Sequence, residues 1–421
     1  MRATGTGRRA GSILVNPGGP GASGLQLADY VQDSLLGAGR EGAELAARYD
    51  IVGFDPRGVH DSAPVRCADD AGTTAFYAVD ATPDDDAERA ALIGATERFA
   101  AGCGERNPRR LPRIGTADAA RDLDRIRAAL GDDELHFLGW SYGTELGTAY
   151  AEQFPGRVGR LVLDGAIAPD IDAAAFAREQ AQALEAGFRT FADRCAADPG
   201  CPLAADGDPA AAFDRLLADL DARPLRVGGT ELTASQVVSG VAQALFSPSE
   251  WDGLAAALAS ALEGDGRSLL GFWNAYAERS PTGHYSNFPS AIAAINCTDY
   301  AWPPGDAGYD ALVTQARAES PRFGQAFLWE FLPCAYWPLP PNPAPAATAP
   351  PAHPILVVGT TGDPSTPYAG AQALAAGLPG AVLLTYRGDQ HTAYLSGSAC
   401  VDDAVSHYFL TGDPPPDATV C

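Results

Sequence analysis

The hydrophobic positions fall into short continuous runs separated by helical patterns. Each run ends in a turn rich in glycine or polar residues, as buried strands do. Between the runs, apolar residues recur every three or four positions, which predicts amphipathic helices. The runs are 13–15, 49–54, 135–138, 160–164, 355–358 and 381–386, and the clearest helical patterns are 117–130, 146–150, 368–378 and 401–410.

The order of these elements predicts the fold class. The first part of the chain alternates strands with helices, which is typical of a mostly parallel sheet with flanking helices. Thr116 stands at the start of the 117–130 pattern and is expected to cap that helix. The sequence therefore predicts an α/β protein.

After residue 168 the pattern becomes helical, with few strand-like runs, and aromatic residues gather towards its end. A proline-rich stretch, 338–354, then leads the chain into another strand. We therefore expect three parts. Residues 1–168 form the first part of the α/β core, 169–350 form a large inserted helical cap with its return linker, and 351–421 form the second part of the core.

The strand at 135–138 leads into a Gly-x-Ser-x-Gly turn, and a helical pattern follows it. The turn is centred on Ser141, with Gly139 and Gly143 on either side. This succession predicts a nucleophile elbow, in which a sharp turn exposes the serine hydroxyl. The glycines leave room for the tight turn. The alternative is a glycine-rich turn whose serine only caps the helix.

A serine nucleophile needs a base, and the base needs an acid that fixes its tautomer. Of the six histidines, only His391 comes just after the last core strand, at the carboxyl-end edge where such sheets bind ligands. Asp363 ends the preceding strand. The chain order Ser141, Asp363, His391 is that of serine hydrolases on an α/β sheet. Asp164 also ends a core strand and is the alternative acid.

A loop dense in glycine, 16–24, follows the first strand. Such a loop lets backbone N–H groups approach a substrate closely, and a serine hydrolase should carry its second oxyanion donor there. We expect the oxyanion donors to be the N–H of Tyr142 and that of Gly18 or Gly19. A phosphate-binding loop would need a Lys-Ser/Thr pair that is missing here; a plain turn is the remaining alternative.

The net charge of the chain limits the classes of partner that we expect. The chain has 421 residues and a formal net charge of −24, and all 29 basic residues are arginine. Nucleic acid and anionic membranes both require a basic face, so neither is an expected partner. No apolar run reaches the ~18 residues of a membrane span. The serine chemistry requires no metal or cofactor, and we expect a monomer.

The eight cysteines are even in number and include no Cys-x-x-Cys pair, which favours disulfides over zinc. Disulfides imply an oxidising compartment, so we expect a secreted protein. Residues 1–10 hold no apolar signal segment. Either the chain begins inside a longer precursor, which we favour, or the cysteines stay reduced. The expected disulfides are sequential: Cys67–Cys103, Cys195–Cys201, Cys297–Cys334 and Cys400–Cys421.

Several motifs together resemble the tripeptidyl-aminopeptidase branch of the prolyl-iminopeptidase-like serine peptidases, which are secreted actinobacterial α/β hydrolases. The resemblance extends over nearly the whole chain. It implies an α/β-hydrolase fold and the release of short peptides or single residues from a free peptide N-terminus. The motifs are Asn-Pro-Gly-Gly-Pro-Gly at 16–21, Gly-Phe-Asp-Pro-Arg-Gly at 53–58, Gly-Trp-Ser-Tyr-Gly at 139–143, and Gly362-Asp363 with His391.

Two positions depart from that family's pattern. Pro17 stands where the family has the histidine of its oxyanion loop, and the resemblance implies that the donor is Gly19. His60 stands where glycine is expected, close enough to the site to alter specificity. An aminopeptidase also needs a carboxylate that binds the substrate amine. The candidate substrate-binding residues are Asp299, Glu330, Glu145 and Trp140.

Three functions remain at this stage. The first is an exported serine aminopeptidase acting on peptides. The second is an esterase or amidase that acts on a small-molecule acyl substrate with the same triad. The third, a binding protein without catalysis, is disfavoured because all three triad residues stand at their expected places. The cap distinguishes the first two functions, because an aminopeptidase needs an amine-binding carboxylate and a blind pocket there.

Overall fold

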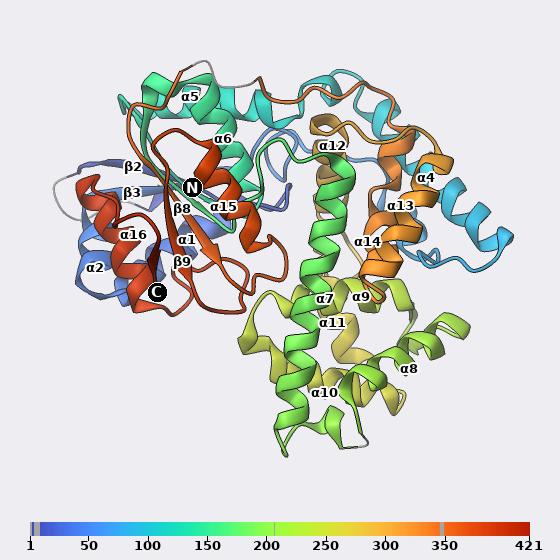
Figure 1. The fold of residues 1–421 in the computed structure, drawn as a ribbon. Coiled ribbons are helices and arrows are strands. Elements are labelled where there is room, and N and C mark those ends of the chain that lie inside the picture. Colours follow the sequence, from blue (N-terminus) through green and yellow to red (C-terminus); the bar gives the residue numbers. More distant parts are fainter. Residues whose placement is uncertain (1, 4–8, 206, 346–348) are drawn as a thin grey trace.

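The computed structural model describes residues 2–3, 9–205, 207–345 and 349–421 (Figure 1). Within these ranges one sheet has the order β1-β3-β2-β4-β5-β8-β9-β10, and all its neighbours are parallel except β1 and β3. The predicted, mostly parallel α/β sheet is confirmed. Its strands are β1 (Arg2–Ala3), β2 (Gly11–Asn16), β3 (Tyr49–Gly53), β4 (Leu135–Trp140), β5 (Val158–Asp164), β8 (Ile355–Thr360), β9 (Val382–Tyr386) and β10 (Thr419–Val420).

Helices cover both faces of the sheet. In β2, Ile13 and Val15 pack with α1, α2 and α16, whereas Leu14 packs with α5, α6 and α15. Because alternate residues point to opposite faces and both are buried, the strands read as continuous apolar runs. The covering helices are α1 (Gly24–Gly37), α2 (Gly39–Arg48), α5 (Thr116–Leu130), α6 (Gly143–Gln153), α15 (Tyr368–Gly377) and α16 (Ala399–Thr411).

The start of α5 differs from the sequence-based expectation. Its N-cap is Gly115 and makes no side-chain cap bond, so the expected cap by Thr116 is wrong. The Thr116 hydroxyl instead donates to Asp299 Oδ2 at 2.6 Å, and the Thr116 N–H donates to Asp299 Oδ1 at 2.9 Å. A carboxylate distant in sequence thus satisfies a free N–H of the first helical turn.

Between β5 and β8 the described residues form helices and loops, and their only strands are those of the β6–β7 hairpin (Leu225–Val227 and Thr230–Leu232). We call residues 165–354 the helical insertion. In Figure 1 it lies to the right of and below the sheet, and α7 runs along the boundary. Its helices are α7 (Ala173–Ala197), α8 (Pro209–Ala222), α9 (Ala234–Leu245), α10 (Trp251–Leu262), α11 (Arg267–Tyr276), α12 (Phe288–Asp299), α13 (Asp306–Glu319) and α14 (Gly324–Glu330).

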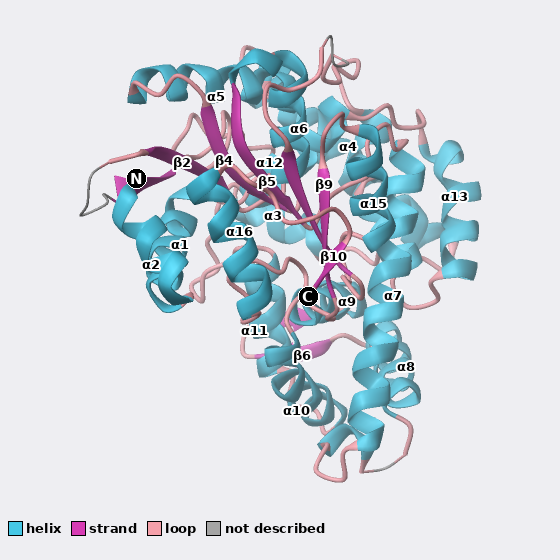
Figure 2. Ribbon diagram, turned by 60° about the vertical axis from the view of Figure 1, so that its left-hand side comes forward, coloured by secondary structure: helices cyan, strands magenta, loops and turns pink. Residues whose placement is uncertain are grey.

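The insertion has its own core. Phe188 of α7, Phe213 of α8 and Val241 of α9 belong to one buried cluster, and Figure 2 shows this part of the molecule as mostly helical, with β6 of the hairpin labelled. Two helices that precede the insertion are α3 (Asp70–Tyr77) and α4 (Asp86–Arg106). Leu92 of α4 packs with Trp329 of α14, so α4 lies with the insertion rather than on the sheet.

Helix α9 lies at the centre of that core. A capping box between Thr233 and Gln236 defines its start, and nearly all of its residues are buried. Its last residue is Leu245, and Phe246 follows as the C-cap. The helix is therefore capped at both ends, and its C-terminal end lies beside the loop after β9, which is described below.

The eight cysteines pair in sequence order, in agreement with the expected disulfides. Cys67–Cys103 joins the loop after β3 to α4, and Cys400–Cys421 joins α16 to the end of the chain. None of the described helices is long and apolar enough to cross a membrane.

Candidate active site

Ser141 lies in a sharp turn between β4 and α6. Its φ is 55°, in the left-handed region that a residue with a side chain rarely adopts. Two hydrogen bonds hold it there: Ser141 N–H donates to the Asp164 carbonyl at 2.9 Å, and Thr144 N–H donates to the Ser141 carbonyl at 2.8 Å. A Cβ on Gly139 would come within 2.3 Å of the Gly143 carbonyl oxygen. The elbow therefore needs both glycines.

His391 and Asp363 form a hydrogen-bonded pair. His391 Nδ1 lies 2.9 Å and 3.0 Å from the two carboxylate oxygens of Asp363. The Asp363 carboxylate also accepts the N–H groups of Ser365 and Thr366, each at 2.8 Å, and only 5% of the residue is exposed. Burial opposes the charged imidazolium, but the charge and hydrogen bond of Asp363 outweigh it and raise the pKa of His391.

Ser141 and His391, the candidate nucleophile and base, both lie beside the end of β5. Asp164, at the end of β5, accepts the Ser141 N–H, and a Cβ on the next residue, Gly165, would lie 3.2 Å from His391 Cε1. In the part of the chain that the structure describes, Ser141 Oγ makes no hydrogen bond to His391 Nε2. In enzymes without substrate this bond is often long and tightens in the complex.

The glycine loop packs directly on the elbow. A Cβ on Gly18 would lie 2.8 Å from Ser141 Cβ and 3.1 Å from Tyr142 N, so a side chain is excluded there. The Gly18 N–H donates to Asn16 Oδ1 at 3.1 Å. Among the described residues, the N–H groups of Gly19 and Tyr142 donate to no other group. Two free donors therefore remain beside the serine.

Two contacts of the base were not foreseen from the sequence. Thr366 Oγ1 donates to Asp363 Oδ2 at 2.9 Å and lies 3.3 Å from His391 Nδ1. The main-chain N–H of His391 donates to the main-chain carbonyl of Phe246 at 2.8 Å, and the centroids of the two rings lie 5.1 Å apart. The Asp-Pro-Ser-Thr turn was a local signal for the first contact. Nothing local predicts the second, because Phe246 belongs to the insertion.

Asp164, the alternative acid, does not bond the imidazole. It is fully buried and accepts the N–H groups of Ala393, at 2.9 Å, and Tyr394, at 2.8 Å. Burial raises the pKa of Asp164 to about 7. The carboxylate on the His391 ring is therefore that of Asp363.

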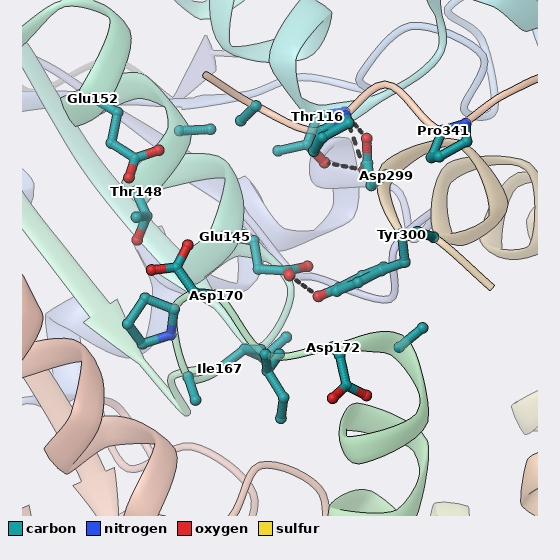
Figure 3. A pocket seen from close by; sticks show the side chains of 18 of the residues that line it. Thr116, Glu145, Thr148, Glu152, Ile167, Asp170, Asp172, Asp299, Tyr300 and Pro341 are labelled. Carbon is teal, nitrogen blue, oxygen red and sulfur yellow. Dashed lines mark hydrogen bonds between the residues drawn. The ribbon is translucent and has the colours of Figure 1, made fainter. Parts of the chain in front are cut away.

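Two of the expected substrate-binding acids line a cavity of about 420 Å³ (Figure 3). Glu145 accepts a hydrogen bond from the Tyr300 hydroxyl, and burial raises the pKa of Glu145 to about 8. Asp299 accepts the two bonds from Thr116, and burial raises its pKa to about 7. Neither Ser141 nor His391 lines this cavity.

Glu330, the third acid, lies inside the insertion. Its carboxylate accepts hydrogen bonds from the hydroxyls of Ser239, at 3.1 Å, and Tyr276, at 2.7 Å. Burial raises the pKa of Glu330 to about 7. Glu330 lines a small cavity of about 50 Å³ together with the aromatic residues Tyr77 and Trp273.

Trp140 and His60, two further residues singled out from the sequence, pack against other parts of the molecule. The Trp140 ring packs edge-on against Tyr30 of α1, 6.0 Å away, and its Nε1 is buried without a hydrogen-bond partner. His60 Nε2 lies 3.0 Å from Glu278 of the insertion, and the His60 N–H donates to Asn287 Oδ1 at 2.7 Å. His60 therefore joins the loop after β3 to the insertion.

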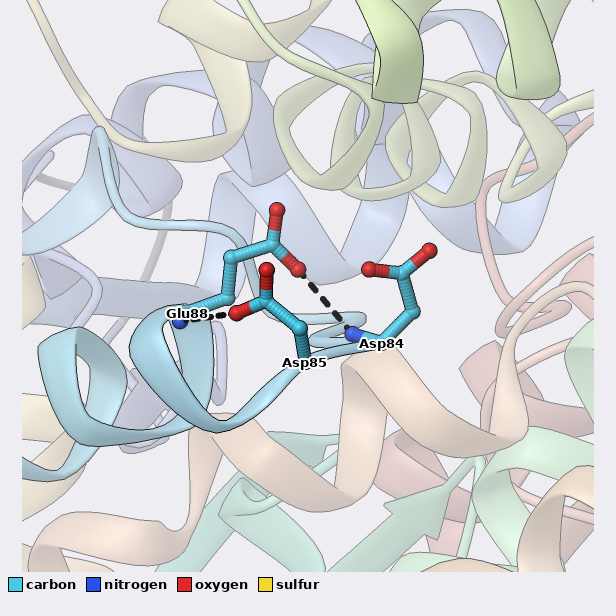
Figure 4. A group of neighbouring side chains, drawn as sticks. All are labelled: Asp84, Asp85 and Glu88. Carbon is cyan, nitrogen blue, oxygen red and sulfur yellow. Dashed lines mark hydrogen bonds between the residues drawn. The ribbon is translucent and has the colours of Figure 1, made fainter.

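A group of acids at the start of α4 has a structural explanation. Asp85 caps the helix by accepting the N–H groups of Ala87 and Glu88, and Glu88 accepts the N–H of Asp84 (Figure 4). Asp84 and Asp85 are exposed. The Asp85 carboxylate serves as the helix cap, and the group is remote from the serine in sequence and element.

The parallel sheet with its strand, serine turn and helix defines the class as an α/β hydrolase. A family described as TAP-like protein matches residues 320–421. Serine protease Hip1 of Mycobacterium tuberculosis is 38% identical over all of this chain and 82% of its own length, and Carboxylesterase B of the same organism gives the same three values. Tripeptidyl aminopeptidase of Streptomyces lividans is 34% identical over 97% of this chain and 76% of its own length. The chain belongs to this tripeptidyl-aminopeptidase-like family of α/β-hydrolase serine peptidases.

Proposed function

We propose that the protein is an exported serine aminopeptidase that removes short peptides from free peptide N-termini. The catalytic residues are Ser141, His391 and Asp363. The helical insertion, within residues 169–350, acts as the cap that selects the substrate, between the core segments 1–168 and 351–421. The observation that carries the proposal is the carboxylate of Glu330 inside that cap.

The geometry supports an acyl-enzyme mechanism. His391 accepts the Ser141 proton as the hydroxyl attacks the carbonyl, and Asp363 holds the imidazole with Nδ1–H facing its carboxylate. The free N–H groups of Gly19 and Tyr142 stabilise the oxyanion, which is often the largest catalytic contribution. His391 then protonates the leaving amine, and water releases the acyl group.

Glu330 has the surroundings of an amine-binding group. Its partners are two neutral hydroxyls, and no arginine or histidine of the described chain pairs with it. A carboxylate without a counter-charge is costly inside a protein. A substrate ammonium would supply that charge, and the aromatic residues Tyr77 and Trp273 line the same cavity. Glu145 and Asp299 line a different cavity, and neither that cavity nor the one at Glu330 is lined by Ser141 or His391.

The length of α9 supports a short peptide. Ser239, which bonds Glu330, and Phe246, which bonds His391, stand two helical turns apart on one face of the helix. At 1.5 Å per residue they are separated by roughly 10 Å along the axis. An extended chain of about three residues spans the same length. The Streptomyces relative is named for tripeptide release.

Two observations bear on the remaining parts of the proposal. The four disulfides support an oxidising compartment outside the cytosol. A relative named Carboxylesterase B is as similar as the named protease. The second candidate function is therefore an esterase or amidase of a small acyl substrate that uses the same three residues.

Chromogenic substrates separate the two functions. We expect hydrolysis of tripeptide anilides with a free N-terminus, less hydrolysis of dipeptide and single-residue anilides, and little of the N-blocked versions. The variant S141A serves as the blank. Hydrolysis of a short acyl ester with no cleavage of any free-amine anilide would instead establish the esterase. Turnover that persists in S141A would refute the catalytic assignment.

A further inference from the structure

Asp164 contacts both sides of the catalytic machinery with different atoms. Its main-chain carbonyl accepts the Ser141 N–H at 2.9 Å, as part of the pairing of β4 with β5. Its carboxylate accepts the N–H groups of Ala393 and Tyr394, which follow His391 by two and three residues. One residue thus fixes the backbone beside the nucleophile and the backbone beside the base.

We infer that Asp164 is a positioning residue that sets the distance between Ser141 and His391, by holding the loop after His391 against the strand that ends beside the serine. This inference rests on the proposed catalytic roles of Ser141 and His391. It does not make Asp164 the catalytic acid, since its carboxylate faces backbone N–H groups and not the imidazole.

The placement of the carboxylate is costly, which argues for a function. Asp164 is fully buried, and a buried carboxyl is stable only when hydrogen bonds satisfy it. The Ala393 N lies 2.9 Å from Oδ2 and 3.1 Å from Oδ1, and the Tyr394 N lies 2.8 Å from Oδ2. In an asparagine the single amide oxygen could accept only at one of these two positions, and the NH₂ group at the other would face the Ala393 N–H, a donor against a donor.

The carboxylate also adds a charge near the base. The groups that contact the His391 ring are Asp363 and Thr366 from the loop after β8 and the uncharged Phe246 at the end of α9, and the carboxylate of Asp164 from β5 acts on it through its charge. Of these, Asp363 and Asp164 favour the imidazolium that forms during attack. Loss of the Asp164 charge therefore shifts the protonation of His391 to lower pH.

A matched control exists in the same loop. Asp402 of α16 is also a buried acid, 7% exposed, and its carboxylate accepts the Leu395 N–H at 2.7 Å. It stabilises the loop after His391 as Asp164 does, but it makes no contact with the strand that ends beside Ser141. A purely structural role would make D164N and D402N alike.

The test measures kcat, KM, the pH dependence of kcat/KM and thermal stability for D164N and D402N, on an activated ester. We expect D164N to lower kcat by about 10- to 100-fold, with KM within about twofold, because one or two hydrogen bonds that fix the base are lost. The acid limb of the kcat/KM profile of D164N should move to lower pH. D402N keeps the wild-type kcat and acid limb even where it unfolds at lower temperature. Equal effects in the two variants, or an unchanged kcat in D164N, would overturn the inference.

The wild-type enzyme provides a second measurement should D164N not fold. The pKa values of Asp164 and His391 are both raised, and the ionised carboxylate offers two acceptors to the loop, so loss of a proton from each group should make the acid limb of kcat/KM steeper than a single ionisation gives. A limb with a slope of one contradicts the inference. Labelling of Ser141 by a fluorophosphonate, with S141A as the blank, keeps the two proposals apart. Without labelling, the proposed function fails, whereas labelling with a slope of one refutes only the role of Asp164.

Discussion

The two acids that matter most for the proposed chemistry are bound in opposite ways. At the sheet edge, Asp363 accepts two backbone N–H groups and a hydroxyl and faces the imidazole of His391. In the insertion, Glu330 accepts only two hydroxyls and has no cationic partner in the described chain. Backbone donors cannot turn away, whereas hydroxyls can rotate to suit a new partner. The first acid is therefore fixed for one role, and the second is free to accept a ligand.

The largest effect should come from Asp363. In D363N the amide can hold the wrong tautomer of His391, so kcat should fall by about 10⁴-fold with little change in KM. Steady-state kinetics on an anilide and an ester measure both values. A loss below tenfold would mean that another acid supports the base, and D164N would then be the variant to compare.

Glu330 should affect only substrates with a free amine. E330Q keeps the shape and removes the charge, so kcat/KM for free-amine tripeptide anilides should fall by about 100-fold. Hydrolysis of an N-blocked substrate or an acyl ester should stay unchanged. Y276F is the matched control, since it removes one neutral hydrogen bond to the same carboxylate and should cost much less. Equal losses on blocked and free substrates would show that Glu330 stabilises the cap and does not bind the amine.

The contrast between the two acids also explains what the sequence could predict. The strands and the serine turn follow from local patterns of the sequence. Asp363 and His391 could be placed from the same patterns, because each follows a strand and parallel strands end at one edge of the sheet. Glu330 was only one of three candidate acids. It meets Ser239, which lies 91 positions away, through packing of α14 on α9, and no local pattern encodes that contact. The failed Thr116 cap has the same cause, since Asp299 satisfies the helix from another part of the chain.

Thr366 should have a smaller effect than either acid. T366V removes the hydroxyl that donates to Asp363 and lies beside His391 Nδ1, while the backbone N–H of the residue remains. We expect kcat to fall by about tenfold with KM unchanged. T366S restores the hydroxyl and should restore most of the rate. If T366S is as slow as T366V, the methyl group and its packing matter more than the hydrogen bond.

The smallest effect should appear in stability. Burial raises the pKa of Glu145 to about 8 and that of Glu330 to about 7, from ordinary values near 4.5. The folded state therefore holds these protons where the unfolded state has lost them. The stabilisation is complete below pH 4 and is lost as the pH rises through 7 and 8. We expect the melting temperature to fall between pH 5 and pH 8.5.

A single variant tests the origin of that fall. E145Q removes the largest of these shifts while keeping an acceptor for the Tyr300 hydroxyl. Its melting temperature should lie above that of the wild type at pH 8.5 and close to it at pH 5, by differential scanning fluorimetry. Because neither Ser141 nor His391 lines the cavity of Glu145, hydrolysis of the tripeptide anilide should not change. A wild-type melting temperature that rises with pH would show that other charges outweigh the buried acids. Equal curves for E145Q and the wild type would exclude Glu145 as a source of the fall.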